Sequence, residues 1–188
     1  MRKQIEDYIA VLNRDIPVVV YEILLLLLCF GTIVFIACYG LKRGWRKVAS
    51  LILVEYVFLI ISSTVIYRTD ENAIGNNFMP FWSYLEIWYE GAKSLIAENV
   101  MYILAFVPIG FLLGVVVKNL RSITMNAFLV ALIGCGISLS VESMQFFLKR
   151  GFAETDDVMH NTFGCLIGYI LAQCSQIMLK GKGLSKLQ

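Results

Sequence analysis

The stretch Met125–Leu148 reads MNAFLVALIGCGISLSVESMQFFL, and Glu142 is its only charged residue. A helix of about 20 mostly apolar residues is long enough to cross the hydrocarbon core of a bilayer. Four further stretches have the same character: Pro17–Tyr39, Val48–Tyr67, Asn99–Val117 and Val158–Leu179. The sequence therefore predicts an all-α fold in one domain, residues 1–188, forming a polytopic membrane helix bundle of about five transmembrane helices.

The composition of the whole chain also indicates a multi-pass protein of the cell membrane. Of the 188 residues, 59% are hydrophobic and 16% are charged, and the mean hydropathy is +0.73. A soluble domain has roughly 45–50% apolar and about 25% charged residues. The net charge of +2, from 16 Lys and Arg against 14 Asp and Glu, leaves no basic surplus for a phosphate backbone. No nucleic-acid partner is expected.

The residues that bind metals or act in common hydrolases do not form recognisable motifs. The five cysteines all lie inside hydrophobic runs, and the single histidine, His160, has no thiolate close to it in the sequence. A structural zinc site needs four Cys or His ligands. The chain also lacks a Gly-rich phosphate loop and a metalloprotease pair. We expect no metal and no cofactor.

Basic residues mark the side of the membrane on which the loops remain. Nine Lys and Arg lie in three segments without Asp or Glu, and they are Lys42, Arg43, Arg46, Lys47, Lys118, Arg121, Lys180, Lys182 and Lys186. Positive loops resist translocation. The sequence predicts an N-terminus outside and a C-terminus inside.

The connection Arg68–Glu98, between the second and third predicted helices, is polar but rich in aromatic rings. Phe81, Leu85 and Trp88 follow each other at helical spacing, which puts them on one face of a short helix. Trp and Tyr favour the interface between lipid and water. We expect an amphipathic interfacial segment on the outer surface.

Glu142 lies about six residues before the outer end of the fourth predicted helix, where a carboxylate is costly unless paired, protonated or facing water. Ser138 and Gln145 share its helix face, and Lys149 and Arg150 follow one to two turns later. Two interpretations stay open. One is a carboxyl that bonds neighbouring helices, and the other is a headgroup or substrate site open to the outer leaflet.

Two acids begin the fifth predicted helix, and one of them suffices to cap it. Asp156 or Asp157 can accept the free N–H groups of the first turn, so the other has a different role. Asp157, Asn161, Gly164 and Gly168 form one polar-to-small stripe. Small residues let helices approach closely, so we expect the fourth helix to pack there and bring Glu142 near Asn161.

Four pieces of sequence, in this order, resemble the VanZ-like family of bacterial membrane proteins. They are STVIYR at Ser63–Arg68, NFMPF at Asn77–Phe81, FVPIGF at Phe106–Phe111, and a final piece made of ESMQ at Glu142–Gln145, Arg150, DDV at Asp156–Val158 and NTFG at Asn161–Gly164. Together they cover about residues 48–172. The family usually carries Asn where Tyr102 stands, and Asn99 lies one turn earlier.

The resemblance implies an envelope protein of a Gram-positive bacterium, because the protein that gives the family its name supports low-level resistance to the glycopeptide teicoplanin. The polar residues that transfer as ligand-binding candidates are Arg68, Asn77, Glu142, Gln145, Arg150, Asp157 and Asn161. We expect these residues to bind an amphipathic ligand at the outer leaflet. Its candidates are the antibiotic and a lipid-linked peptidoglycan precursor, with membrane lipid as a further partner.

Two other classes of function remain open. A membrane-embedded transferase or hydrolase acting on a lipid-linked substrate would use Glu142 or Asp157 as its catalytic general acid or base. A membrane scaffold protein would need only the glycine faces and the interfacial aromatic residues.

Overall fold

The computed structural model describes Leu27 and residues 41–66, 75–117 and 122–181. Apart from Leu27, the first predicted stretch, Pro17–Tyr39, lies outside the described residues.

Each of the other four predicted stretches is helical. They are α3 (Leu41–Ile61), continued by the π-helical turn η1 (Ser62–Ile66), then α5 (Ser94–Val116), α6 (Ile123–Leu148) and α7 (Thr155–Gly181). Within the described part of the chain, three helices are long and apolar enough to cross a membrane: Trp45–Ile66, Ser94–Val116 and Ile123–Leu148. The total of five membrane crossings, including one by α7, stays a prediction.

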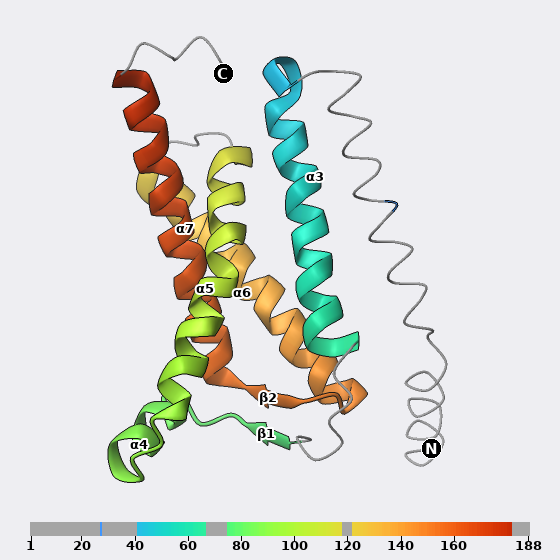
Figure 1. Ribbon diagram of the computed structural model, residues 1–188, viewed down its shortest axis with the longest axis vertical. Helices are drawn as coiled ribbons and strands as arrows, with labels where there is room; N and C mark the ends of the chain where they lie inside the picture. Colours follow the sequence, from blue (N-terminus) through green and yellow to red (C-terminus); the bar gives the residue numbers. More distant parts are fainter. Residues whose placement is uncertain (1–26, 28–40, 67–74, 118–121, 182–188) are drawn as a thin grey trace.

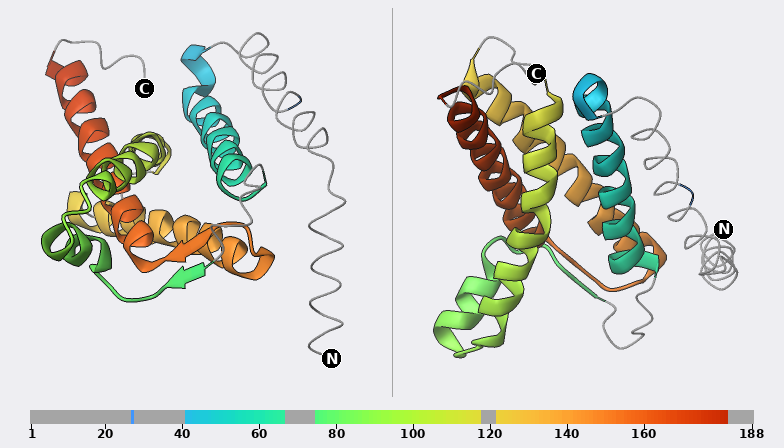
Figure 2. Two further views of the ribbon diagram at one scale, coloured as in Figure 1. Left: turned by 60° about the horizontal axis from the view of Figure 1, so that its bottom comes forward. Right: turned by 45° about the horizontal axis from the view of Figure 1, so that its top comes forward.

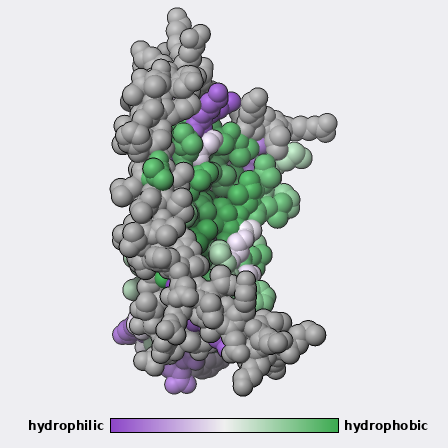
Figure 3. Space-filling view, turned by 90° about the vertical axis from the view of Figure 1, so that its right-hand side faces the viewer, coloured by the Kyte–Doolittle hydropathy of each residue, from purple (hydrophilic) through white to green (hydrophobic). Residues whose placement is uncertain are grey.

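The surface of the bundle matches a bilayer environment. Figure 3 shows an apolar band at middle height, with hydrophilic residues above and below it. Large apolar side chains point outward from the helices, among them Val54 on α3, Met101 on α5 and Phe128 on α6. A soluble protein rarely exposes so wide an apolar surface. The outside of these helices is therefore suited to lipid.

Glycines allow α5 and α7 to pack with their backbones in contact, and the two helices run side by side (Figures 1 and 2). A Cβ atom on Gly164 would lie 2.2 Å from the carbonyl oxygen of Ile103, and one on Gly168 would lie 2.0 Å from that of Val107. Gly110 of α5 is equally close to the backbone of α7. The close packing expected at Gly164 and Gly168 is confirmed.

The expectation that the fourth helix packs against this stripe is wrong. Helix α6 meets α7 elsewhere, where Gly134 faces the side chain of Cys165. Gly110, Gly164 and Gly168 each meet the backbone of the facing helix, whereas Gly134 of α6 meets a side chain. Sequence spacing identifies a small-residue face but does not say which of several helices covers it.

Two short strands add a small sheet to the helical fold. Strand β1 (Gly75–Asn77) pairs in parallel with β2 (Phe152–Glu154), and Asn76 is opposite Ala153. The all-α class predicted from the sequence is therefore incomplete. Three residues are too few to show strand periodicity.

The sheet and the short helix α4 (Trp82–Tyr89) lie at one end of the bundle, which we call the sheet end (Figure 1). Helix α3 begins and α7 ends at the opposite end. The basic residues of early α3 and late α7 thus share one end, as the topology prediction requires. Which end faces outward stays a prediction.

Candidate functional site at the sheet end

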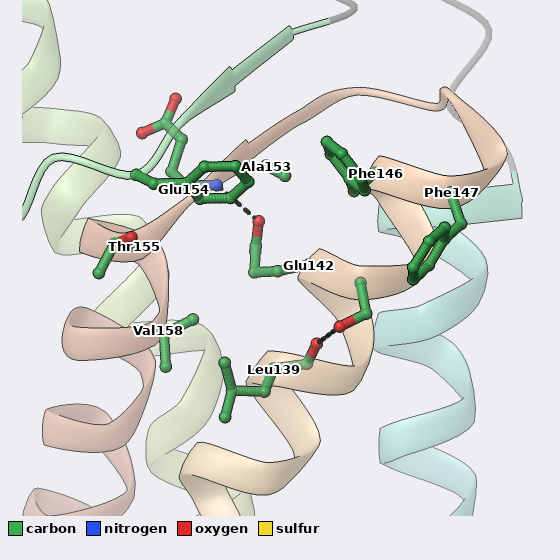
Figure 4. Close-up of a pocket in the computed structure, with 10 residues that line it drawn as sticks. Leu139, Glu142, Phe146, Phe147, Ala153, Glu154, Thr155 and Val158 are labelled. Carbon is green, nitrogen blue, oxygen red and sulfur yellow. Dashed lines mark hydrogen bonds between the residues drawn. The ribbon is translucent and has the colours of Figure 1, made fainter.

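Glu142 joins α6 to the sheet. It is 8% exposed, and its Oε2 accepts a hydrogen bond of 2.9 Å from the backbone N–H of Glu154 in β2 (Figure 4). The side chain of Glu154 points away from Glu142, and its Oε2 accepts a hydrogen bond from Trp82 Nε1 at 3.0 Å. The buried carboxyl therefore bonds a strand, where the sequence suggested neighbouring helices.

Gln145 and Arg150 bond the C-terminal end of the α3–η1 helix. Gln145 Nε2 donates to the carbonyl oxygen of Thr64 at 3.2 Å, and Arg150 Nη1 donates to that of Ile66 at 2.5 Å. The last carbonyls of a helix lack partners within it, and a cation there also complements the helix dipole. Both predicted ligand-binding residues thus hold the end of this helix.

Asp156 caps a helix other than its own. Its carboxylate accepts hydrogen bonds from the backbone N–H groups of Phe81 at 2.5 Å and Ser83 at 2.9 Å, and from Ser83 Oγ at 2.6 Å. These groups belong to the start of α4. The expectation that one of the two acids has a role besides capping α7 is confirmed for Asp156, which the ligand-binding set omitted.

Further polar contacts attach α4 to the bundle. Asn99 Nδ2 donates to Ser83 Oγ at 3.1 Å, and Tyr84 Oη lies 2.8 Å from His160 Nε2. Asn99, Ser83 and His160 are all buried. Sequence reasoning missed this cluster because its members are separated by up to 76 positions. The available signal was that Asn99 and His160 lie inside apolar stretches.

Of the remaining predicted residues, Asn161 and Asp157 are buried on α7 and Asn77 lies in β1. Asn161 Nδ2 donates to Ser138 Oγ at 2.8 Å, one turn before Glu142 on α6. Asn77 Oδ1 accepts a hydrogen bond from the N–H of Met79 in a local turn. Arg68 lies outside the described residues.

A cavity of about 290 Å³ opens beside Glu142. Figure 4 shows Phe146 and Phe147 of α6 on one side and Thr155 and Val158 of α7 on the other. The full lining is Phe78, Leu139, Glu142, Ser143, Phe146, Phe147, Ala153, Glu154, Thr155 and Val158. The cavity is thus a mainly apolar space with a carboxyl group in its wall.

A second cavity of about 290 Å³ is lined in part by the same two phenylalanines. Its lining is more polar and consists of Gly75, Asn76, Gln145, Phe146, Phe147, Lys149 and Gly151. The predicted polar residues therefore do not gather in one pocket. Glu142 lines the first cavity and Gln145 lines the second.

A family model described as VanZ/LLP1 matches residues 18–178, which confirms the resemblance found in the sequence motifs. No curated protein and no solved structure gives a significant match to the chain.

Proposed function

This chain belongs to the VanZ/LLP1 family, and from that premise we propose that it binds the hydrocarbon part of an amphipathic ligand at the outer leaflet. It is a VanZ-like protein of the cell envelope. The observation that carries the proposal is the apolar cavity at the sheet end, with the carboxyl of Glu142 in its wall.

The lining of the cavity suits a hydrocarbon chain. Phe78, Phe146 and Phe147 offer aromatic faces, and Leu139 and Val158 offer branched aliphatic ones. Each methylene group transferred from water to such a site gains about 0.8 kcal/mol. Ligand pockets are commonly apolar with a few polar groups that fix orientation. Glu142 supplies such a group next to the hydrocarbon.

The ligand we propose is teicoplanin or a lipid-linked peptidoglycan precursor, in the envelope of a Gram-positive bacterium. Both are amphipathic, and both would be met at the outer leaflet. Binding either one would protect the cell by keeping antibiotic and precursor apart. This choice rests on the family and on the apolar lining together.

The hydrogen bond of Glu142 allows a test that separates binding from catalysis. Its bond to the Glu154 N–H needs an acceptor oxygen, and an amide supplies one as well as a carboxylate does. A general acid or base needs a titratable proton. Glu142→Gln should therefore keep antibiotic protection if the protein binds, and should abolish it if Glu142 is catalytic.

A variant that fills the cavity tests the proposal directly. Leu139 lines the cavity and is 51% exposed, so Leu139→Trp should fold while blocking the space. Leu132 lies two turns earlier on α6, is 53% exposed and does not line the cavity, so Leu132→Trp is the matched control.

Teicoplanin and lipid-linked precursor would each be added to the purified proteins and followed by native mass spectrometry. Binding should fall at least tenfold in Leu139→Trp and stay unchanged in Leu132→Trp. Equal binding by both variants and the unmodified protein would contradict the proposal.

The outer location has a test of its own. Glu90 follows α4 and Arg46 lies early in α3, and both are exposed. An impermeant maleimide should label Glu90→Cys in intact cells, and Arg46→Cys only after permeabilisation. The unmodified chain is the control, because it shows how much label the native cysteines take up. The reverse pattern would place the cavity at the inner leaflet.

A further inference from the structure

We propose that one acyl chain of a bilayer phospholipid enters the cavity beside Glu142 from the side, and that the ligand of the proposed function binds by displacing it. The displacement rests on the proposed function, whereas occupancy by the lipid chain stands on the geometry of the cavity. The observation that carries the inference is the direction of the opening, which lies on a face of a membrane-spanning helix.

The opening of the cavity lies on the exposed side of α6. Leu139, Ser143 and Phe147 line the cavity at spacings of four residues, so they share one side of the helix. All three are exposed, and so is Leu132, two turns before Leu139. These residues belong to Ile123–Leu148, a helix long and apolar enough to cross a membrane. In a bilayer, the opening therefore faces hydrocarbon and not water.

The size of the cavity fits one hydrocarbon chain. Ala153 and Val158 are buried and form its inner side. An apolar cavity of about 150 Å³ stays dry and accepts one benzene molecule, so a volume of about 290 Å³ has room for roughly ten to twelve carbon atoms. Leu139 and Phe147 are about 12 Å apart along the helix axis. The cavity thus follows α6, as an acyl chain in a bilayer would, and it is too small for both chains of a phospholipid.

The polar groups in the wall are bonded within the protein. Ser143 Oγ donates to the carbonyl oxygen of Leu139 at 2.6 Å. Glu142 Oε2 accepts from the N–H of Glu154 at 2.9 Å, and Glu154 Oε2 accepts from Trp82 Nε1 at 3.0 Å. A lipid headgroup would have to compete for these groups, whereas hydrocarbon needs none of them. The wall therefore favours the chain of a lipid over its headgroup.

A photoreactive lipid tests whether a chain reaches the inner side of the cavity. The full chain is reconstituted into vesicles of phosphatidylglycerol and phosphatidylcholine, with a share of phosphatidylcholine that carries a diazirine midway along one acyl chain. After irradiation, the labelled residues are identified by peptide mass spectrometry. Val158 is 9% exposed, so label there requires a chain inside the cavity, while Met101 on α5 is 65% exposed and reports bulk lipid. We expect label on both residues.

Ser143 and Ser140 give a matched pair of blocking variants. Both are exposed on α6, and each Oγ donates to the carbonyl oxygen three to four residues earlier, but only Ser143 lines the cavity. Ser143→Trp should lower the label on Val158 about tenfold by filling the opening, and Ser140→Trp should leave it unchanged. Val158 without label in the unmodified protein while Met101 is labelled, or equal label on Val158 in the two variants, would overturn the lipid chain.

The proposed ligands separate this inference from the proposed function. Teicoplanin or lipid-linked precursor, added to the vesicles before irradiation, should lower the label on Val158 and leave the label on Met101 unchanged. Label on Val158 that neither ligand lowers would overturn the displacement and, with it, the proposed function, but would keep the lipid chain. Absence of label on Val158, in a protein that still binds either ligand in a way that Leu139→Trp abolishes, would overturn the lipid chain alone.

Discussion

The contact between α5 and α7 and the contacts at the sheet end hold the protein together in different ways. Between α5 and α7, Gly110, Gly164 and Gly168 bring backbone against backbone. At the sheet end, the carboxyl groups of Glu142 and Asp156 accept hydrogen bonds from backbone N–H groups 12 and 73 positions away in sequence. One region depends on the absence of side chains, and the other depends on particular side-chain atoms.

The difference follows from the surroundings of each region. Lipid is as apolar as a helix surface, so helices within it associate through close packing. At the sheet end, buried N–H groups of a strand and of a helix start need acceptors, and an unmade hydrogen bond is costly. The helical contact should therefore tolerate no added volume, and the sheet end should not tolerate the loss of an acceptor.

The largest expected effect comes from adding volume between α5 and α7. Gly168→Leu would place atoms on the backbone of α5, which must separate the helices. We expect the thermal midpoint in detergent to fall by about 6–12 °C, since overpacking at a backbone contact costs about 3 kcal/mol. Gly136→Leu is the control, because a Cβ there meets nothing within 4 Å. Equal midpoints for the two variants would refute the packing shown for Gly168.

The second effect concerns the cap of α4. Asp156→Asn replaces an acceptor oxygen by an NH₂ group that faces the donors of Phe81 or Ser83. We expect a loss of about 2–3 kcal/mol, with faster hydrogen exchange confined to α4 and its flanks. Glu98→Gln, at an exposed acid, is the control. Uniformly faster exchange throughout the bundle would show that Asp156 supports the whole fold instead.

A smaller change removes a single hydroxyl group. Tyr84→Phe deletes the contact with His160 and keeps the ring. The expected loss is about 1 kcal/mol, or roughly 2–4 °C in the thermal midpoint. Tyr89→Phe, at a residue 75% exposed on the same helix, should change the midpoint by less than 1 °C. A loss of the same size in both variants would argue against a specific Tyr84–His160 bond.

The smallest effect on stability is expected at Trp88, which is 83% exposed on α4. Trp88→Ala should change the free energy of unfolding by less than about 0.5 kcal/mol. If α4 rests on the membrane interface, brominated lipids should quench the fluorescence of Trp88 in vesicles, measured after replacing Trp45 and Trp82 by Phe. Full accessibility of Trp88 to aqueous iodide, without quenching by lipid, would place α4 in water.

The sequence was sufficient for the helices but not for their arrangement. Long apolar runs predict α3, α5, α6 and α7 because the length needed to cross a bilayer is fixed. Gly164 and Gly168 predict a close contact but not its partner, since every neighbouring helix is equally apolar. The β1–β2 pair was not predicted, because three-residue strands carry no periodic pattern. The two strands are also far apart in sequence, and they meet only when the helices between them have packed.

The candidate site was predicted only in part, because motifs identify side chains but not the groups that they contact. Family motifs singled out Glu142, Gln145 and Arg150, and the structure brings all three to the sheet end. Their partners are mostly backbone groups, which every residue possesses and which no motif can reveal. Phe146 and Phe147, which line both cavities, belong to a long apolar run and were not singled out.

The parallel pairing of β1 with β2 also sets an order of events during synthesis. Gly75 pairs with Phe152, so β1 emerges from the ribosome well before its partner. The pairing closes a long loop, and its entropy cost is met only when α5 and α6 are in place. Both cavities depend on that closure. The ligand binding proposed above would thus be acquired only after β2 has been made.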